Sequence, residues 1–117
     1  MSSSKWEALL EMQLKAAKIP YEREFQAIPE RRFRWDFCCQ GFPQDASKRF
    51  IPTNILVEIQ GGIWKKMAHS SGTGITRDAE KQSLAAIHGF RVILATGAQV
   101  KSGQCLQWIE QALGVKR

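Results

Sequence analysis

The sequence has no uninterrupted apolar run close to the roughly 20 residues of a transmembrane helix, so no helical membrane span is expected. Its first ten residues, MSSSKWEALL, lack the apolar core of a signal peptide. The three cysteines, Cys38, Cys39 and Cys105, are odd in number and have no C-x-x-C spacing, which indicates neither a disulfide framework nor a zinc site. We therefore expect buried or half-buried thiols in a protein of the reducing cytoplasm, without a membrane partner.

Positive charge is what the sequence has in excess. Its 117 residues include 17 Lys and Arg against 11 Asp and Glu, which gives a formal net charge of +6 and a pI near 9.6. The apolar content of 44% and the charged content of 24% are ordinary for a globular protein, and the length suits one domain over residues 1–117. The charge favours a polyanionic partner, most simply nucleic acid.

The apolar pattern predicts a mixed α/β fold. A helix is expected from a capping box at Ser4 and Glu7 to Pro20. Alternating runs over 21–28 and 33–39, joined by a turn, predict a β-hairpin. Further strands are expected over 55–60 and 90–95, helices over 77–88 and 102–113, and loops over 40–53 and 65–74. A helix between the last two strands implies that they run parallel.

Glu58 interrupts the otherwise apolar strand over 55–60. A buried, unpaired carboxylate is costly, so Glu58 must be paired, protonated or bound to a metal. Asp36 lies on the polar side of the preceding strand, and the two carboxylates converge if these strands pair. Two such groups repel each other unless a cation lies between them, and Mg²⁺ prefers carboxylate, water and phosphate oxygens. We therefore predict that Asp36 and Glu58 bind Mg²⁺, with Mn²⁺ as a substitute.

These features together resemble the PD-(D/E)XK nuclease superfamily. The segments REFQAIPERRFRWDF, VEIQGGIW and GITRDAEKQSLAAIHGFRVI resemble those of small, often phage- or prophage-borne members, and the resemblance covers about residues 21–113. It implies an α-β-β-β-α-β-α restriction-endonuclease-like core, with a mixed central sheet flanked by helices. It also implies a Mg²⁺-dependent endodeoxyribonuclease in which Asp36 and Glu58 are the metal ligands.

The resemblance points to three more catalytic residues. The family's third motif position is usually Lys, but here it is Gln60, which can hydrogen-bond a water or a phosphate oxygen without supplying charge. Lysines migrate to other elements within the superfamily, and Lys81 is the candidate, with a solvated helix charge as its alternative role. A further acidic residue often comes from the first helix or the strand after it. Glu24 is our choice and Glu11 the alternative, although each is otherwise an ordinary surface carboxylate.

Basic residues surround the acidic pair in the sequence. Arginines can hold a nucleic-acid backbone while the metal ion neutralises the scissile phosphate. The alternatives are scattered solubilising charge for the basic residues and a plain loop histidine for His69. We predict nucleic-acid contacts for Arg32, Arg34, Lys65, Lys66, His69 and Arg77.

The sequence thus predicts a metal-dependent DNA endonuclease that hydrolyses phosphodiester bonds, with branched DNA such as a Holliday junction as one candidate substrate. Cutting a junction would require a homodimer, because one site cuts one strand. The main alternative is a non-catalytic nucleic-acid-binding module on the same fold, since Gln60 replaces the usual lysine. A third is a structural or assembly protein that binds no metal.

Overall fold

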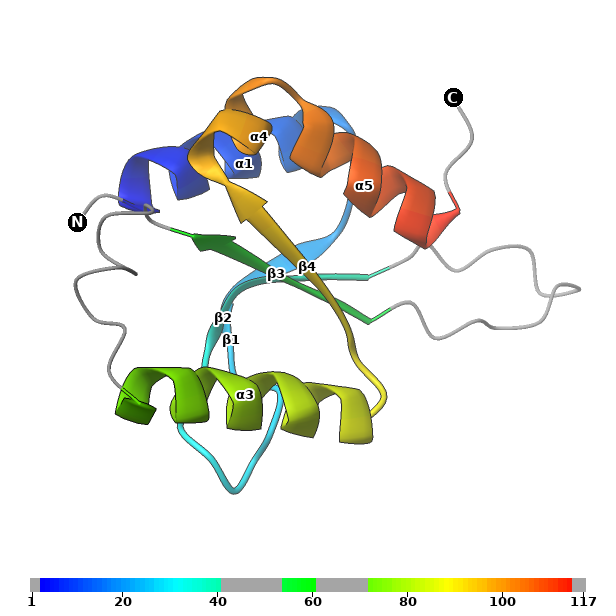
Figure 1. The fold of residues 1–117 in the computed structure, drawn as a ribbon. Coiled ribbons are helices and arrows are strands. Elements are labelled where there is room, and N and C mark those ends of the chain that lie inside the picture. Colours follow the sequence, from blue (N-terminus) through cyan, green and yellow to red (C-terminus); the bar gives the residue numbers. More distant parts are fainter. Residues whose placement is uncertain (1–2, 41–53, 61–71, 115–117) are drawn as a thin grey trace, which may run out of the picture.

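A four-stranded mixed sheet with helices on both faces forms the centre of the molecule (Figure 1). The computed structural model describes residues 3–40, 54–60 and 72–114. In chain order the elements are α1 (Ser3–Ala16), β1 (Tyr21–Phe25), β2 (Trp35–Cys39), β3 (Ile55–Gln60), α3 (Gly72–Ile87), β4 (Arg91–Thr96), α4 (Gly97–Lys101) and α5 (Gln104–Leu113). Among these described residues no helix is both long and apolar enough to cross a membrane. The predicted mixed α/β class is confirmed.

The strands lie in the order β1-β2-β3-β4. β1 and β2 form the predicted antiparallel hairpin, and β2 pairs antiparallel with β3, with Phe37 opposite Val57. β3 and β4 run parallel, and all six residues of β3 have partners in β4. The strands of Asp36 and Glu58 therefore do pair, which was the condition for their convergence, and the predicted parallel pair around a crossover helix is confirmed.

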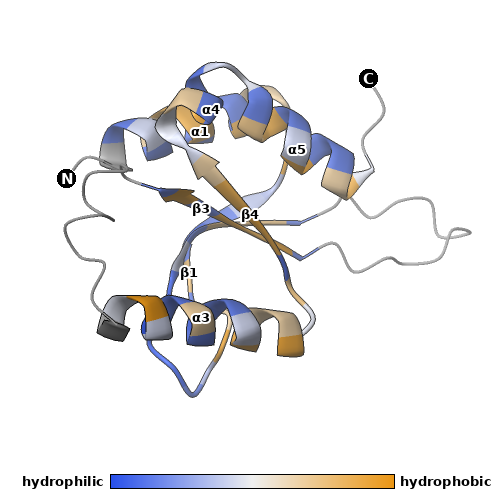
Figure 2. Cartoon of the chain, in the orientation of Figure 1, coloured by the Kyte–Doolittle hydropathy of each residue, from blue (hydrophilic) through white to orange (hydrophobic). Residues whose placement is uncertain are grey.

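The two faces of the sheet are covered by different helices. α1, α4 and α5 lie over one face and α3 over the other (Figure 1). Val57 and Ile59 pack toward the α1 face, while Leu56 packs toward α3, as alternation along a strand requires. β3 and β4 are accordingly hydrophobic along most of their length (Figure 2).

The cysteines follow the same alternation. All three cysteines are buried, as predicted: Cys38 and Cys39 lie on opposite faces, and Cys105 lies on the α1 face. Burial raises the pKa of Cys39 to about 12 and that of Cys105 to about 11. These thiols therefore stay neutral and pack as small hydrophobic groups.

The hairpin crosses from one face of the sheet to the other within β1 and β2. Trp35 packs on the α3 face but Phe37 on the α1 face, although residues two apart on a regular strand point the same way. β1 changes face at the same level, because Arg23 lies over the Phe37 ring while the Phe25 ring contacts that of Phe90. The change of face falls at Asp36 on β2 and at Glu24 on β1. Both strands pass between the two helix layers in Figure 1.

Several predicted boundaries differ from the structure. α3 begins at Gly72, so the predicted loop over 65–74 is wrong for its last three residues, where glycines and threonine were taken as loop signals despite the modest cost of glycine in a helix. The hairpin strands are shorter than predicted, spanning 21–25 and 35–39. α1 begins at Ser3, one residue before the predicted cap at Ser4.

The predicted last helix corresponds to α5, and the structure has an additional short helix, α4, before it. α4 and α5 are separated by Gly103, which has a left-handed φ of 87°. Thr96 and Gln99 form a capping box at the start of α4, which explains why the chain turns helical directly after β4. The next residue, Gly97, lies against the Trp6 ring of α1, where a Cβ atom would come within 2.4 Å of the indole. This close approach fixes the position of α4 on α1.

Candidate functional site

Asp36 lies where β2 separates from β3. The last paired residues are Phe37 and Val57, and beyond them the Oδ2 atom of Asp36 accepts a hydrogen bond of 2.8 Å from the backbone N–H of Ile59. Ile59 follows Glu58, so the bond brings Asp36 to the part of β3 that carries Glu58. The local separation of the strands thus gives a side-chain carboxylate access to a backbone donor of the central strand.

Burial raises the pKa of Asp36 to about 6. The negative charges of Glu7, Glu58 and Glu24 act in the same direction, while the hydrogen bond from Ile59 opposes them. The ionised form of a carboxylate that is buried near other carboxylates is disfavoured, and a nearby cation stabilises it. The arrangement therefore favours a cation next to Asp36.

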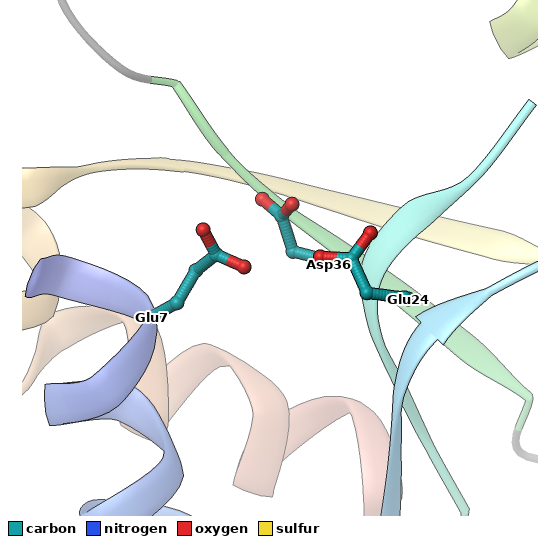
Figure 3. Close-up of side chains that lie close together, drawn as sticks. All are labelled: Glu7, Glu24 and Asp36. Atoms are coloured by element: carbon teal, nitrogen blue, oxygen red, sulfur yellow. The ribbon is translucent and has the colours of Figure 1, made fainter. Parts of the chain in front are cut away.

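Three carboxylates from three elements meet at Asp36. One oxygen atom each of Glu7, Glu24 and Asp36 lies within 4.8 Å of the others (Figure 3). Glu7 is buried, Asp36 is half-buried and Glu24 is exposed, so the group opens toward solvent on one side. Hard divalent cations prefer such oxygen ligands, and Mg²⁺ retains several waters when few protein ligands are present. The donor set fits a magnesium or manganese ion.

Glu7 is the member of this group that sequence reasoning missed. Its carboxylate was assigned to helix capping, but in the structure its Oε1 atom pairs with Nη2 of Arg23 at 3.1 Å and its side chain is only 8% exposed. The available signal was helical spacing, because Glu7 lies three and seven residues before Leu10 and Leu14 on the buried stripe of α1. A carboxylate on an apolar stripe poses the same question as Glu58 does in an apolar strand.

Glu11, the predicted alternative from the first helix, lies outside the three-carboxylate group. Its two carboxylate oxygens accept hydrogen bonds from the Tyr21 hydroxyl at 2.6 Å and from Arg23 at 2.8 Å. The hydrogen bond from Tyr21 lowers the pKa of Glu11. Glu11 therefore holds α1 to β1, one helical turn away from the group.

Glu24 has the position predicted for it, on the strand that pairs with the Asp36 strand. The pairs on either side, Arg23 with Phe37 and Phe25 with Trp35, put Glu24 level with Asp36. Its φ of 50° is left-handed, a conformation that costs a residue other than glycine about 1 to 2 kcal/mol. Backbone strain of this kind occurs most often at functional sites.

Glu58 is paired with Lys81 of α3. The Nζ atom of Lys81 lies 2.5 Å from Oε1 of Glu58, donates to the carbonyl of Arg34 at 2.9 Å, and lies 4.8 Å from the centroid of the Trp35 ring. The Lys81 side chain is only 13% exposed, so it is not a solvated helix charge. The ion pair explains how β3 accommodates a carboxylate, and Lys81 does lie next to the acidic site.

Gln60 ends β3, partly buried and level with Thr96 of β4. It is two residues beyond Glu58 and therefore lies further along the same strand face. Its amide cannot supply the positive charge that Lys81 brings to Glu58. Any catalytic role for Gln60 stays a prediction.

Of the arginines predicted to contact nucleic acid, Arg77 lies over Phe33, together with Arg31, which was not among them. The guanidinium groups of Arg31 and Arg77 lie 4.9 and 5.9 Å from the centroid of the Phe33 ring, and Arg31 also forms an ion pair with Glu80. Phe33 thereby joins the β1–β2 connection to the start of α3, with Arg32 and Arg34 exposed beside it. Lys65, Lys66 and His69 lie outside the described residues.

Comparisons of the chain with family models, with curated proteins and with solved structures each found no match. What the protein does must therefore be argued from the carboxylates, the Lys81–Glu58 pair and the arginines of the hairpin.

Proposed function

We propose that the protein is a divalent-metal-dependent nuclease that hydrolyses phosphodiester bonds of DNA in the cytoplasm. The observation that carries this proposal is the group formed by Glu7, Glu24 and Asp36, whose oxygens lie within 4.8 Å of one another. The pKa of Asp36, raised to about 6 by burial and by the negative charges of Glu7, Glu58 and Glu24, supports it, because a bound cation would compensate the charge of Asp36.

Oxygen atoms of Glu7, Glu24 and Asp36 would hold the ion, with Mg²⁺ as the expected metal and Mn²⁺ as a substitute. A bound ion would polarise the phosphate and lower the pKa of a water molecule. Asp36 is oriented for this role by the hydrogen bond from Ile59. Lys81, held by Glu58 and by the carbonyl of Arg34, provides positive charge beside the scissile phosphate, which the amide of Gln60 cannot.

Membership of the PD-(D/E)XK superfamily is part of the same proposal. It is supported by the order of the elements, by the parallel pair of β3 and β4 around α3, and by an aspartate at the point where β2 and β3 separate. A small basic nuclease of this kind suits branched DNA such as a Holliday junction. Cutting both strands would require a homodimer, which places two sites on one substrate.

The first test is cleavage of labelled four-way junction, flap, duplex and single-stranded DNA, with and without Mg²⁺ or Mn²⁺. We expect metal-dependent cleavage, and we expect Asp36→Ala to reduce the rate on the order of a thousandfold, because a metal ion supplies several kcal/mol of charge stabilisation. Equal rates for the variant and the unchanged protein would contradict the proposal.

Matched variants identify the metal ligands. Glu24→Gln is matched by the control Glu22→Gln, which removes the same charge from the same strand. Glu7→Gln is matched by the control Glu11→Gln, one helical turn further along α1. Calorimetry with Mn²⁺ should show loss of binding for Glu24→Gln and Glu7→Gln, with binding kept in the two control variants. Failure of the unchanged protein to bind Mn²⁺ would refute the metal site independently of any cleavage assay.

One observation favours a second candidate, a non-catalytic nucleic-acid-binding module. Gln60 carries no charge, and the amino group of Lys81 is already engaged by Glu58 and by the carbonyl of Arg34. Such a module would bind DNA in a salt-sensitive manner that neither Mg²⁺ nor Asp36→Ala changes. Binding without cleavage of any of the four substrates would favour it over the nuclease.

A further inference from the structure

The connection between β1 and β2 lines an open surface pocket of about 630 Å³. Its lining consists of Gln26, Pro29, Glu30, Arg31, Arg32 and Arg34. Three arginines against one glutamate leave this hairpin pocket positively charged. In Figure 1 the connection projects beyond α3, on the side of the molecule away from α1.

The hairpin pocket has an internally braced wall. The side-chain amide of Gln26 donates to the carbonyl of Arg31 at 2.7 Å and to that of Pro29 at 3.4 Å. The backbone N–H of Arg31 bonds to the carbonyl of Ile28 at 3.1 Å. These bonds fix the turn before any ligand arrives, which lowers the ordering cost of binding there.

The three arginines of the pocket have different surroundings. Arg31 is neutralised by Glu80 and stacks on Phe33, so it serves mainly as a wall. Arg32 and Arg34 are exposed, and within residues 3–40, 54–60 and 72–114 neither forms an ion pair. A guanidinium group offers a planar fork of donors that matches two oxygens of a phosphate.

Arg34 connects the hairpin pocket with the acidic site. Its side chain lines the pocket, while its carbonyl accepts a hydrogen bond from Lys81, the partner of Glu58. Arg34 and Asp36 are two residues apart, so their Cα atoms are separated by at most about 7 Å. One nucleic-acid strand carries a phosphate about every 3.4 Å along the helix axis, so a strand that passes both places can present one phosphate to each.

We propose that the hairpin pocket binds a backbone phosphate of the nucleic acid through Arg32 and Arg34, on the same strand as the phosphate beside Asp36. The identity of the ligand rests on the proposed function, which this inference deepens by adding a second anchor point on the same strand. Phosphate contacts fix register and orientation without reading bases. The pocket would therefore set where along the strand the acidic site lies.

The test measures binding without metal, by fluorescence anisotropy of labelled duplex and branched DNA in EDTA at several salt concentrations. The double variant Arg32→Gln/Arg34→Gln should bind about tenfold more weakly or worse, and its salt dependence should fall by about one unit of slope per lost contact. The control Lys15→Gln/Lys101→Gln removes the same charge from exposed positions of α1 and α4. Equal weakening by both double variants would overturn the pocket as a site.

A second arm locates the phosphate. A series of DNA strands carries one uncharged methylphosphonate linkage each, at a different position in each strand. The unchanged protein should bind one of these strands more weakly than the others. The double arginine variant should be insensitive at that position. Absence of any such position would overturn the inference.

The two proposals fail separately. Metal-dependent cleavage combined with unchanged affinity in the arginine variant would overturn the hairpin pocket and leave the nuclease intact. DNA binding through the pocket without cleavage or Mn²⁺ binding would uphold the pocket and refute the nuclease. Both arginines are exposed, so the variants should fold, which circular dichroism checks.

Discussion

The two faces of the sheet differ in how much they bury. The α1 face has a large buried cluster that includes Leu10, Val57 and Ile109, with helices α1, α4 and α5 above it. On the other face the buried cluster is less than half as large, and α3 contributes to it one fully buried residue, Ala85. The α3 face also carries the charged side chain of Lys81 at its edge.

The helices that contribute most of the buried core are therefore not the helix that carries Lys81. The acidic site lies where the hairpin passes from one face to the other. Its buried member, Glu7, stands on the well-packed helix α1, whereas Lys81 stands on the lightly packed helix α3. This arrangement suits the proposed function, because carboxylates on the well-packed helix can stay in place while a cation on the lightly packed helix adjusts to a substrate.

The largest effect on stability should come from the α1 face. Leu10→Ala, at a fully buried position, should lower the free energy of unfolding by about 3 kcal/mol, because it leaves a cavity in the larger cluster. Leu84→Ala on α3 is the same chemical change at a partly buried position and should cost about 1 kcal/mol. Urea denaturation measures both. Equal losses would show that the two faces stabilise the fold equally.

A smaller effect should come from the boundary between the faces. Asp36 has a pKa of about 6 in the folded protein against a normal value of 3.8, so ionising it costs the fold stability as pH rises between these values. Asp36→Asn keeps an acceptor for the Ile59 N–H and removes the charge. Without metal, the variant should equal the unchanged protein below pH 4 and exceed it by about 2 kcal/mol at pH 8, the partial exposure of Asp36 being discounted.

Thermal or urea unfolding across this pH range gives the measurement, with Asp78→Asn at an exposed position of α3 as the control. The control should show no comparable gain at pH 8. Mg²⁺ should then stabilise the unchanged protein at pH 8 and leave Asp36→Asn unaffected. A variant less stable than the unchanged protein at pH 8 would mean that the carboxylate is already compensated without metal.

The sequence predicted the elements with strong patterns. β3 was placed without error at 55–60, because a run that is apolar except at Glu58 and Gln60 ends abruptly at Gly61 and Gly62. The parallel pairing of β3 and β4 followed from the helix between them. α4 was missed, because a five-residue helix is too short to show an apolar period and its Thr96–Gln99 capping box was not recognised.

The acidic site was predicted only in part, because strand pairing can be read from the sequence pattern but tertiary contacts cannot. Asp36 and Glu24 could be placed level with each other from strand pairing alone. The change of face at these two residues could not be foreseen, since Glu24 adopts a left-handed conformation without being Gly or Asn. That change of face determines which carboxylates gather. The grouping of Glu7 with Asp36, and the pairing of Glu58 with Lys81, are therefore tertiary results.

The smallest expected effect concerns the Lys81–Glu58 pair, which joins α3 to β3 on the α3 face. Lys81→Met leaves the Glu58 carboxylate uncompensated beside Asp36 and should cost more stability than Glu58→Gln, while the double variant should regain part of the loss. A double-mutant cycle by urea denaturation should give a coupling of about 1 kcal/mol, because both side chains are partly exposed.

The control is another ion pair of α3, in which Glu80 pairs with Arg31 of the β1–β2 connection. The side chains of Arg31 and Glu80 are 43% and 40% exposed. Its cycle should give less than about 0.5 kcal/mol, since water screens the charges more fully. Equal couplings would mean that the burial of Lys81 does not strengthen its ion pair with Glu58. A larger coupling for Lys81 would instead identify this pair as the contact through which α3 positions positive charge at the acidic site.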